Sequence, residues 1–399
     1  MTIRLTATQS SERILSLDLI RGIAVLGILL MNISSFSMIG QAYINPTIMG
    51  GLEGANKWVH QFNYIFANQK FMSIFSILFG AGIVLFSERV IAKGFSAAKY
   101  YYRRLFFLLI FGLIHAYLIW MGDILVAYSL CGAIAFLFRN TRPTIILIVA
   151  MLIFSVPPLM NISWFMFVPV EEINESLSWW PMPEAEIANR LSIMRGGFMD
   201  IQPVRFEGAV ELQTVYFGFH TFWRALSMML IGMYLYKKYI LQARKANSYY
   251  TKLAIVGFVV GLAFCYHGVS KAYEHNWDAA HGFVYTEIFN YIGSLFLALS
   301  YIALICLWSN SSGGQKLKSL LMKAGKMAFT VYILTSVICT FFFYGYGLGY
   351  IGYFDRVAQL LTVIVVWVVL LMFTHFYSQR FGQGPLEKLW RKLTYGQVQ

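Results

Sequence analysis

Residues 357–378 read VAQLLTVIVVWVVLLMFTHFYS, a run without a single Asp, Glu, Lys or Arg. A helix of about 20 mostly apolar residues is long enough to cross the hydrocarbon core of a bilayer. Further apolar runs precede it at 17–39, 69–87, 104–121, 123–138, 143–161, 214–236, 250–267, 284–308 and 325–345. The sequence therefore predicts an all-α, polytopic membrane bundle of about ten transmembrane helices. The third and fourth runs nearly touch, which predicts a tight hairpin turning at Met121, Gly122 and Asp123.

The composition agrees with a chain whose main solvent is the lipid bilayer. Of its 399 residues, 58% are hydrophobic and only 12% are charged, far from the balance of a soluble domain. The formal charge of +13 lies in short clusters between apolar runs, so it indicates membrane orientation and no nucleic-acid partner. Four cysteines stand singly in apolar stretches without the spacing of a zinc site, so no metal is predicted.

The distribution of basic residues predicts how the bundle is oriented. Cytoplasmic loops of membrane proteins carry the excess of Lys and Arg, and here the excess recurs in every second connection. The members are Arg4 and Arg13; Arg89, Lys93, Lys99, Arg103 and Arg104; Arg139 and Arg142; Lys237, Lys238, Arg244 and Lys245; Lys316, Lys318 and Lys323; and Arg380, Lys388, Arg391 and Lys392. Both termini are therefore expected in the cytoplasm, with the first apolar run retained as a helix of a multi-pass protein of the plasma membrane.

We expect one integral membrane domain over residues 1–399. It divides into an N-terminal five-helix half over 1–161, an extracytoplasmic connection over 162–213 and a C-terminal five-helix half over 214–399. The connection holds most of the acids, and Trp179, Trp180, Ile187, Leu191 and Met194 predict an amphipathic helix at the membrane surface. It is either a lid or a solvated loop. Residues 50–68, with Trp58, His60 and Phe62, have a similar outer character.

Ionisable side chains within a membrane cost about 2.5 to 3.5 kcal/mol each at a helix centre, so each is a candidate functional residue. Counted along their helices, one set falls in an outward-leaning layer: Lys70, His115, Asp123, His220, Arg224 and Glu287. A second set lies at the cytoplasmic rim: Asp18, Arg21, Arg103 and Arg104.

His115 suits a general base because imidazole titrates near neutral pH, and Asp123 would orient it. The alternative is a neutral histidine bonded to a neighbouring helix. His220 and Arg224 form an i,i+4 pair that either binds substrate or lets the arginine reach the interface. Glu287 and Lys70 are either site residues or a structural ion pair.

At the rim, Asp18 and Arg21 lie three residues apart, which predicts a local ion pair. Arg104 either binds a cytosolic anion such as a cofactor phosphate or only sets orientation.

Several stretches resemble the YeiB-like bacterial membrane proteins. They are RILSLDLIRGIA (13–24), FSILFGAG (75–82), GLIH (112–115) and GDIL (122–125). The C-terminal stretches AGKMAFTVY (324–332), YGLG (346–349), GPLE (384–387) and TYG (394–396) are similar to the domain of unknown function numbered 418, which defines that family.

The opening Leu-Asp-x-x-Arg-Gly is also similar to transmembrane acyltransferases, including the heparan-glucosaminide acetyltransferase type and bacterial O-acyltransferases. The resemblance implies transfer of an acyl group from cytosolic acyl-CoA to an acceptor on the far side. In the O-acyltransferases an Arg-x10-His pattern on the first helix supplies the catalytic histidine. Here that pattern runs from Arg21 to Asn32, so the role does not carry over, whereas Arg104 to His115 has the same spacing on the third helix.

The leading hypothesis is a transmembrane acyltransferase with His115 and Asp123 as catalytic residues. Arg103, Arg104, Asp18 and Arg21 would meet the CoA at the rim. Asn32, Lys70, His220, Arg224 and Glu287 would contact an extracytoplasmic glycan or another small acceptor. The alternative is a secondary transporter of a small solute, with His115, Asp123, Arg224 and Glu287 along the path. The sequence leaves the acyl group, acceptor and oligomeric state open.

Overall fold

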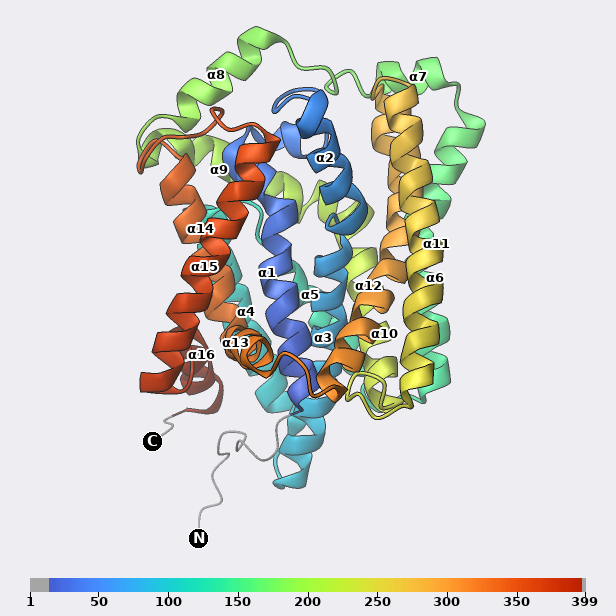
Figure 1. Ribbon diagram of the computed structural model, residues 1–399, viewed down its shortest axis with the longest axis vertical. Helices are drawn as coiled ribbons and strands as arrows, with labels where there is room; N and C mark the ends of the chain where they lie inside the picture. The colour runs from blue at the N-terminus through green and yellow to red at the C-terminus, as the bar shows by residue number, and fades with distance from the viewer. Residues whose placement is uncertain (1–13, 397–399) are drawn as a thin grey trace.

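The computed structural model describes residues 14–396, and every regular element in that range is a helix (Figure 1). Arg4 and Arg13, used above for orientation, lie outside the described residues. The all-α polytopic prediction is confirmed. Each predicted segment has one α-helix as its main part, namely α1 (Leu15–Ser37), α3 (Lys70–Ala92), α4 (Ala97–Ile114), α5 (Leu125–Ala135), α6 (Pro143–Phe167), α10 (Phe222–Lys237), α11 (Asn247–Glu274), α12 (Thr286–Asn310), α14 (Ala328–Phe343) and α15 (Arg356–Phe381).

Within residues 14–396, seven helices are long and apolar enough to cross a membrane, or up to eight if one bent pair counts as a span. The pair is α13 (Gln315–Lys326) with α14, bent by 83° at Met327. Among the predicted segments, α5 is a shorter apolar helix, and α10 has only 16 residues. The number ten and the cytoplasmic termini remain predictions.

Extra helices gather at the end of the bundle where α1 ends and α15 begins (Figure 1). They are α2 (Gly54–Phe66), α7 (Val170–Ser176) and α8 (Glu184–Met194), followed by α9 (Phe198–Gln213), which lies deeper along the bundle. We call residues 170–213 the cap. The last helix, α16 (Pro385–Tyr395), lies at the opposite end.

The cap differs from the single amphipathic helix expected over residues 162–213. Helix α6 continues to Phe167, and the rest of the connection forms three helices. Trp180, expected at the membrane surface, is buried; it lies among residues that include Trp277 and donates its Nε1–H to the Trp277 carbonyl at 2.8 Å. Pro183, next to the start of α8, and the Gly196-Gly197 pair before α9 explain why the chain bends at these points.

Glycines hold the central helices in close contact. A Cβ on Gly80 of α3 would lie 1.8 Å from the Met229 carbonyl oxygen, and one on Gly232 of α10 would lie 1.9 Å from that of Ile77. At the other crossing, Gly22 of α1 faces the backbone of Leu321 on α13. Small residues at crossings let helix backbones approach closely in a membrane, where side-chain packing has to supply the association energy.

Three long helices carry a π-helical turn at one end, and each turn contains a histidine. They are η3 (His115–Ile119) after α4, η5 (Phe217–Thr221) before α10 and η6 (Ala280–Tyr285) before α12. The histidines are His115, His220 and His281. Single π-turns inside helices occur often at functional sites because they redirect side chains.

Candidate functional site

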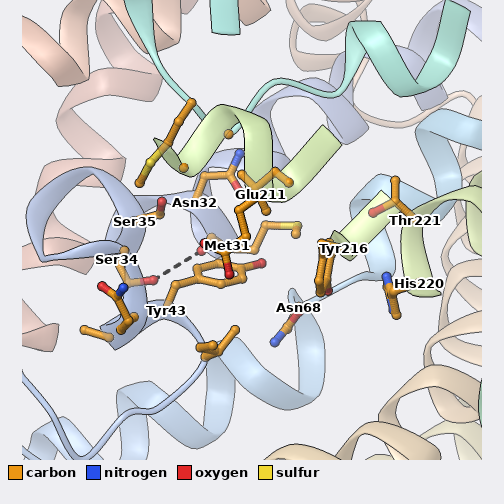
Figure 2. A pocket seen from close by; sticks show the side chains of 18 of the residues that line it. Met31, Asn32, Ser34, Ser35, Tyr43, Asn68, Glu211, Tyr216, His220 and Thr221 are labelled. Atoms are coloured by element: carbon orange, nitrogen blue, oxygen red, sulfur yellow. Dashed lines mark hydrogen bonds between the residues drawn. The ribbon is translucent and has the colours of Figure 1, made fainter. Parts of the chain in front are cut away.

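A cavity of about 1510 Å³ lies under the cap. Its walls come from α1, α2, α8, α9, η5 and the start of α12, and Figure 2 shows Asn32, Tyr43, Asn68, Glu211, Tyr216 and His220 around the same space. Polar side chains are frequent in the wall: Asn32, Gln41, Tyr43, Asn63, Asn68, Gln69, Asp123, Glu207, Glu211, Tyr216, His220, Glu287 and Gln359. The volume suits a ligand larger than a single amino acid, and the wall offers it apolar as well as polar contacts.

His220 and Glu287 form a hydrogen-bonded pair in this wall. The Nε2 atom of His220 lies 2.9 Å from Oε1 of Glu287, and the imidazole stacks on Tyr216. Gln69 donates from its Nε2 to both oxygens of Glu287, at 2.8 and 2.9 Å. The Nδ1 atom of His220 is buried and has no hydrogen-bond partner among residues 14–396. This arrangement favours a tautomer with the proton on Nε2 and a free lone pair on Nδ1.

Two basic side chains stand behind this pair, fully buried in the bundle. Lys70 donates to Asn290 Oδ1 at 2.6 Å and to the Tyr64 carbonyl at 2.8 Å. Arg224 donates to the Tyr291 carbonyl at 3.0 Å, to Ser73 Oγ at 2.7 Å and to the Ser294 hydroxyl. Among the described residues, neither the guanidinium nor the ammonium is paired with a carboxylate at salt-bridge distance, and the hydrogen bonds of both groups go to neutral oxygens.

The predicted pair of His115 and Asp123 lies in a neighbouring part of the bundle. His115 Nδ1 is 2.7 Å from Asp123 Oδ2, and both side chains are almost completely buried. Asp123 also accepts the backbone N–H of Val126 at 2.8 Å, at the first turn of α5. Asp123 lines the cavity, while the buried Nε2 of His115 has no hydrogen-bond partner. The structure thus brings the two residues together, and their catalytic role remains a prediction.

Helix α9 closes the cavity on the side of η3. Gln202 donates to the Tyr117 carbonyl at 2.8 Å, and the Tyr117 hydroxyl donates to Gln213 at 3.3 Å. The same helix presents Glu207 and Glu211 to the cavity. Acids that the sequence analysis used only for topology therefore belong to the candidate site, since an i,i+4 spacing puts both on one helix face.

Asn32 of α1 and Tyr43 also line the cavity (Figure 2). Asn32 also borders a second void of about 10 Å³ between α1 and α14, together with Val25 and Tyr332. Burial raises the pKa of Tyr43, and the Glu287 carboxylate raises it further. The phenol is therefore neutral and can donate a hydrogen bond to a ligand.

The predicted rim residues lie at the opposite end of the bundle. Arg21 donates to Asp18 at 3.0 Å, the local pair expected from their spacing. The Arg104 guanidinium lies 3.9 Å from the Trp390 ring centroid of α16, and the Trp390 indole donates to the Arg104 carbonyl. Arg103 is exposed. Arg104 therefore joins α4 to α16, and a phosphate-binding role for these residues remains a prediction.

Sequence reasoning missed Gln69, Tyr43, Asn68 and Tyr216 in the cavity wall. Gln69 has a positive φ of 66°, uncommon for a residue other than glycine, and it ends the bend between α2 and α3. The sequence gives one indication of its role, since Gln69 stands beside Lys70 at the start of an apolar run. The partner of its side chain, Glu287, is 218 residues away and could not be identified from spacing.

Comparison with known proteins identifies relatives but no described activity. A family model described as "Protein of unknown function (DUF418)" matches residues 235–397. The chain is 31% identical to "Uncharacterized protein YxaH" of Bacillus subtilis (strain 168), over 98% of this chain and 96% of the relative. It is 29% identical to "Uncharacterized protein YeiB" of Escherichia coli (strain K12), over 96% of each. No solved structure matches the chain significantly.

Proposed function

The chain belongs to the DUF418 family of bacterial proteins, and from this premise we propose that it is an acyltransferase of the plasma membrane. In this proposal an acyl group passes from cytosolic acyl-CoA to a hydroxyl or amine acceptor in the cavity under the cap. The observation that carries it is the His220–Glu287 pair in the cavity wall. A histidine oriented by a carboxylate is a general base for such acceptors.

The proposed acyl transfer needs only the two substrates and the residues of this pair, with Gln69 behind them. The acceptor O–H or N–H loses its proton to His220 Nδ1 while its heavy atom bonds to the thioester carbonyl carbon. The C–S bond then breaks, and the CoA thiolate takes up the proton from the imidazole. Glu287 holds Nε2–H throughout and stabilises the transient imidazolium, as Gln69 holds Glu287. The products are the acylated acceptor and CoA with a free thiol.

The geometry favours His220 over His115 as the base. A general base has to come within hydrogen-bond reach of the proton that it removes. His220 lines the cavity, and a shift of the wall has to expose its buried Nδ1, whereas His115 does not line the cavity and only its partner Asp123 reaches the wall. In the proposal, His115 and Asp123 position the turn between η3 and α5 at the edge of the cavity.

The transporter alternative assigned Arg224 to a solute path. The Arg224 guanidinium is fully buried, and its two terminal nitrogens donate to the Tyr291 carbonyl, Ser73 and Ser294. A residue in that position acts more readily as a fixed positive charge behind the wall than as part of a path. This favours bond chemistry within a cavity over transport along these residues.

The test is release of free CoA from acetyl-, octanoyl- and palmitoyl-CoA by purified protein in proteoliposomes, followed by mass spectrometry. Glucose and glucosamine serve as hydroxyl and amine acceptors, and acylated sugar is measured in parallel. The His220→Gln variant should lose about 10²-fold or more of the rate, the usual contribution of a general base. His267→Gln, a histidine on α11 that contacts Tyr285, is the control and should keep its rate.

Binding is measured separately through the unfolding temperature with each acyl-CoA. A saturable rise, reduced in Arg104→Ala and kept in His220→Gln, would separate donor binding from chemistry. If no acyl-CoA raises the unfolding temperature and no CoA is released, the proposal is refuted. If His115→Gln loses the rate while His220→Gln retains it, the base is His115 and our assignment of the cavity histidine is wrong.

A further inference from the structure

The turn between α11 and α12 holds three metal-ligating side chains in one place. Helix α11 ends at Glu274, and Asn276 and Trp277 both have left-handed backbone conformations, with φ of 51° and 56°. This turn folds His275 back over His281, so that the rings stack with centroids 3.5 Å apart and an interplanar angle of 1°. Asp278 lies between them in sequence.

The three donors are close enough to share one ion. One ligand atom from each of His275, Asp278 and His281 lies within 4.8 Å of the others. His281 Nδ1 is already 3.0 Å from both oxygens of Asp278. Ligands bound at about 2.0 to 2.1 Å in a tetrahedral zinc site lie roughly 3.4 Å apart, so rotations about the side-chain bonds suffice.

Capping explains only part of this arrangement. Asp278 accepts the backbone N–H of His281 at 2.8 Å and so caps the first turn of η6. That role needs neither imidazole. Two histidines brought face to face beside a carboxylate, on a turn with two strained non-glycine residues, are accounted for by a shared ligand. The prediction of no metal rests on the spacing of the four cysteines, and the His275-x2-Asp278-x2-His281 spacing contains no cysteine.

We propose that His275, Asp278 and His281 bind a divalent transition-metal ion, with Zn²⁺ as the best match to two imidazoles and one carboxylate. Three protein ligands leave a fourth position for water or another ligand. This inference does not depend on the acyltransferase proposal.

The position of the turn gives the ion a structural consequence. Asn174 of the cap accepts the Ala280 N–H at 2.9 Å, and Trp180 of the cap donates to the Trp277 carbonyl. Trp277 and Gly282 also line the cavity. A bound ion would therefore fix the turn on which the cap rests, and cap and cavity would become more ordered when the ion is present.

The full-length protein in detergent is treated with chelator, and Zn²⁺ or Co²⁺ is then added. Bound metal is counted by mass spectrometry, and Co²⁺ reports coordination through its visible absorption. We expect one equivalent per chain, a rise in unfolding temperature, and the intense absorption of a tetrahedral cobalt site.

His275→Gln is the main variant because His275 is exposed and its replacement leaves the buried turn intact. It should weaken binding at least tenfold, and Asp278→Asn should do the same. His267→Gln again is the control and should bind as wild type does. Equal affinity in wild type and His275→Gln, or no stoichiometric metal in wild type, would overturn the proposal.

Discussion

Replacing Gly80 by alanine should destabilise the protein, while the same replacement at Gly82, two residues later on α3, should not. A Cβ at position 80 would lie 1.8 Å from the Met229 carbonyl oxygen and 2.5 Å from its carbon, which both belong to the backbone of α10. A Cβ at position 82 meets no atom within 4 Å. The two variants therefore make the same chemical change in the same helix with different steric outcomes.

The magnitude follows from the displacement that the new methyl group requires. To bring the 1.8 Å contact to 3.0 Å, α3 and α10 must separate by at least about 1.2 Å near the crossing. That movement also strains the 2.7 Å hydrogen bond from Arg224 on α10 to Ser73 on α3. Overpacking of this kind costs about 1 to 3 kcal/mol. Alanine itself favours a helix over glycine by about 0.5 to 1 kcal/mol, so Gly82→Ala should be neutral or slightly stabilising.

The assay uses the four cysteines, all of which are free and buried. A thiol-reactive fluorophore therefore reports unfolding in detergent, because it reacts with these cysteines only when unfolding exposes them, and no cysteine has to be introduced. Gly80→Ala should unfold at a lower temperature than wild type, and Gly82→Ala at the same or a higher one. Equal unfolding temperatures for the two variants would refute the close α3–α10 crossing.

Two further predictions concern buried polar contacts. Glu387 of α16 accepts hydrogen bonds from the backbone N–H groups of Phe329 and Thr330, at 2.7 and 3.0 Å, at the start of α14. Glu387→Ala leaves both donors unpaired and should lower the free energy of unfolding by about 2 to 4 kcal/mol, and Glu387→Gln should lower it by about half as much. Equal unfolding temperatures for wild type and Glu387→Ala would contradict this capping role. Lys70 and Asn290 are fully buried, and the Lys70 ammonium donates a hydrogen bond to Asn290 Oδ1 at 2.6 Å. Asn290→Leu leaves the ammonium with the Tyr64 carbonyl as its remaining acceptor, so it should lower the free energy of unfolding more than Lys70→Met does. In the double variant this free energy should fall by less than the sum of the two single decreases, and strict additivity would show that the two side chains do not interact.

The presence of the helices could be predicted because an apolar run long enough to cross a bilayer needs no tertiary information. The details of their ends could not. The run 325–345 conceals a sharp break, because α13 turns away from α14 to lie against α1, where Gly325 faces the Asp18 carbonyl. Only the packing of two distant segments produces that bend. The cap illustrates the same point, since Trp180 is buried by Trp277, almost a hundred residues further on.

The polar layer could be placed by depth but its partners could not. The prediction that His220 and Arg224 form one i,i+4 pair assumes a regular α-helix between them. Residues Phe217–Thr221 instead form a π-turn, and this changes the direction of the residues before α10. Both side chains contact the Tyr291 ring, but His220 bonds to Glu287 at the cavity, while Arg224 donates to Ser73 and to the Tyr291 carbonyl inside the bundle. Depth depends on residue number, but direction around the helix depends on local winding and packing.

The motifs that carry the family resemblance and the residues that line the cavity are largely different sets. Gly22 and Gly325 hold α1 against α13, Gly80 holds α3 against α10, and Glu387 caps α14. These residues maintain the framework. Gln69, Glu211, His220 and Glu287 face the cavity and stand outside the quoted stretches, whereas Asp123 belongs to both sets. A resemblance built mainly on framework residues therefore supports the fold more strongly than the reaction. The proposed chemistry has to be judged at His220 and Glu287, where a change need not disturb helix packing.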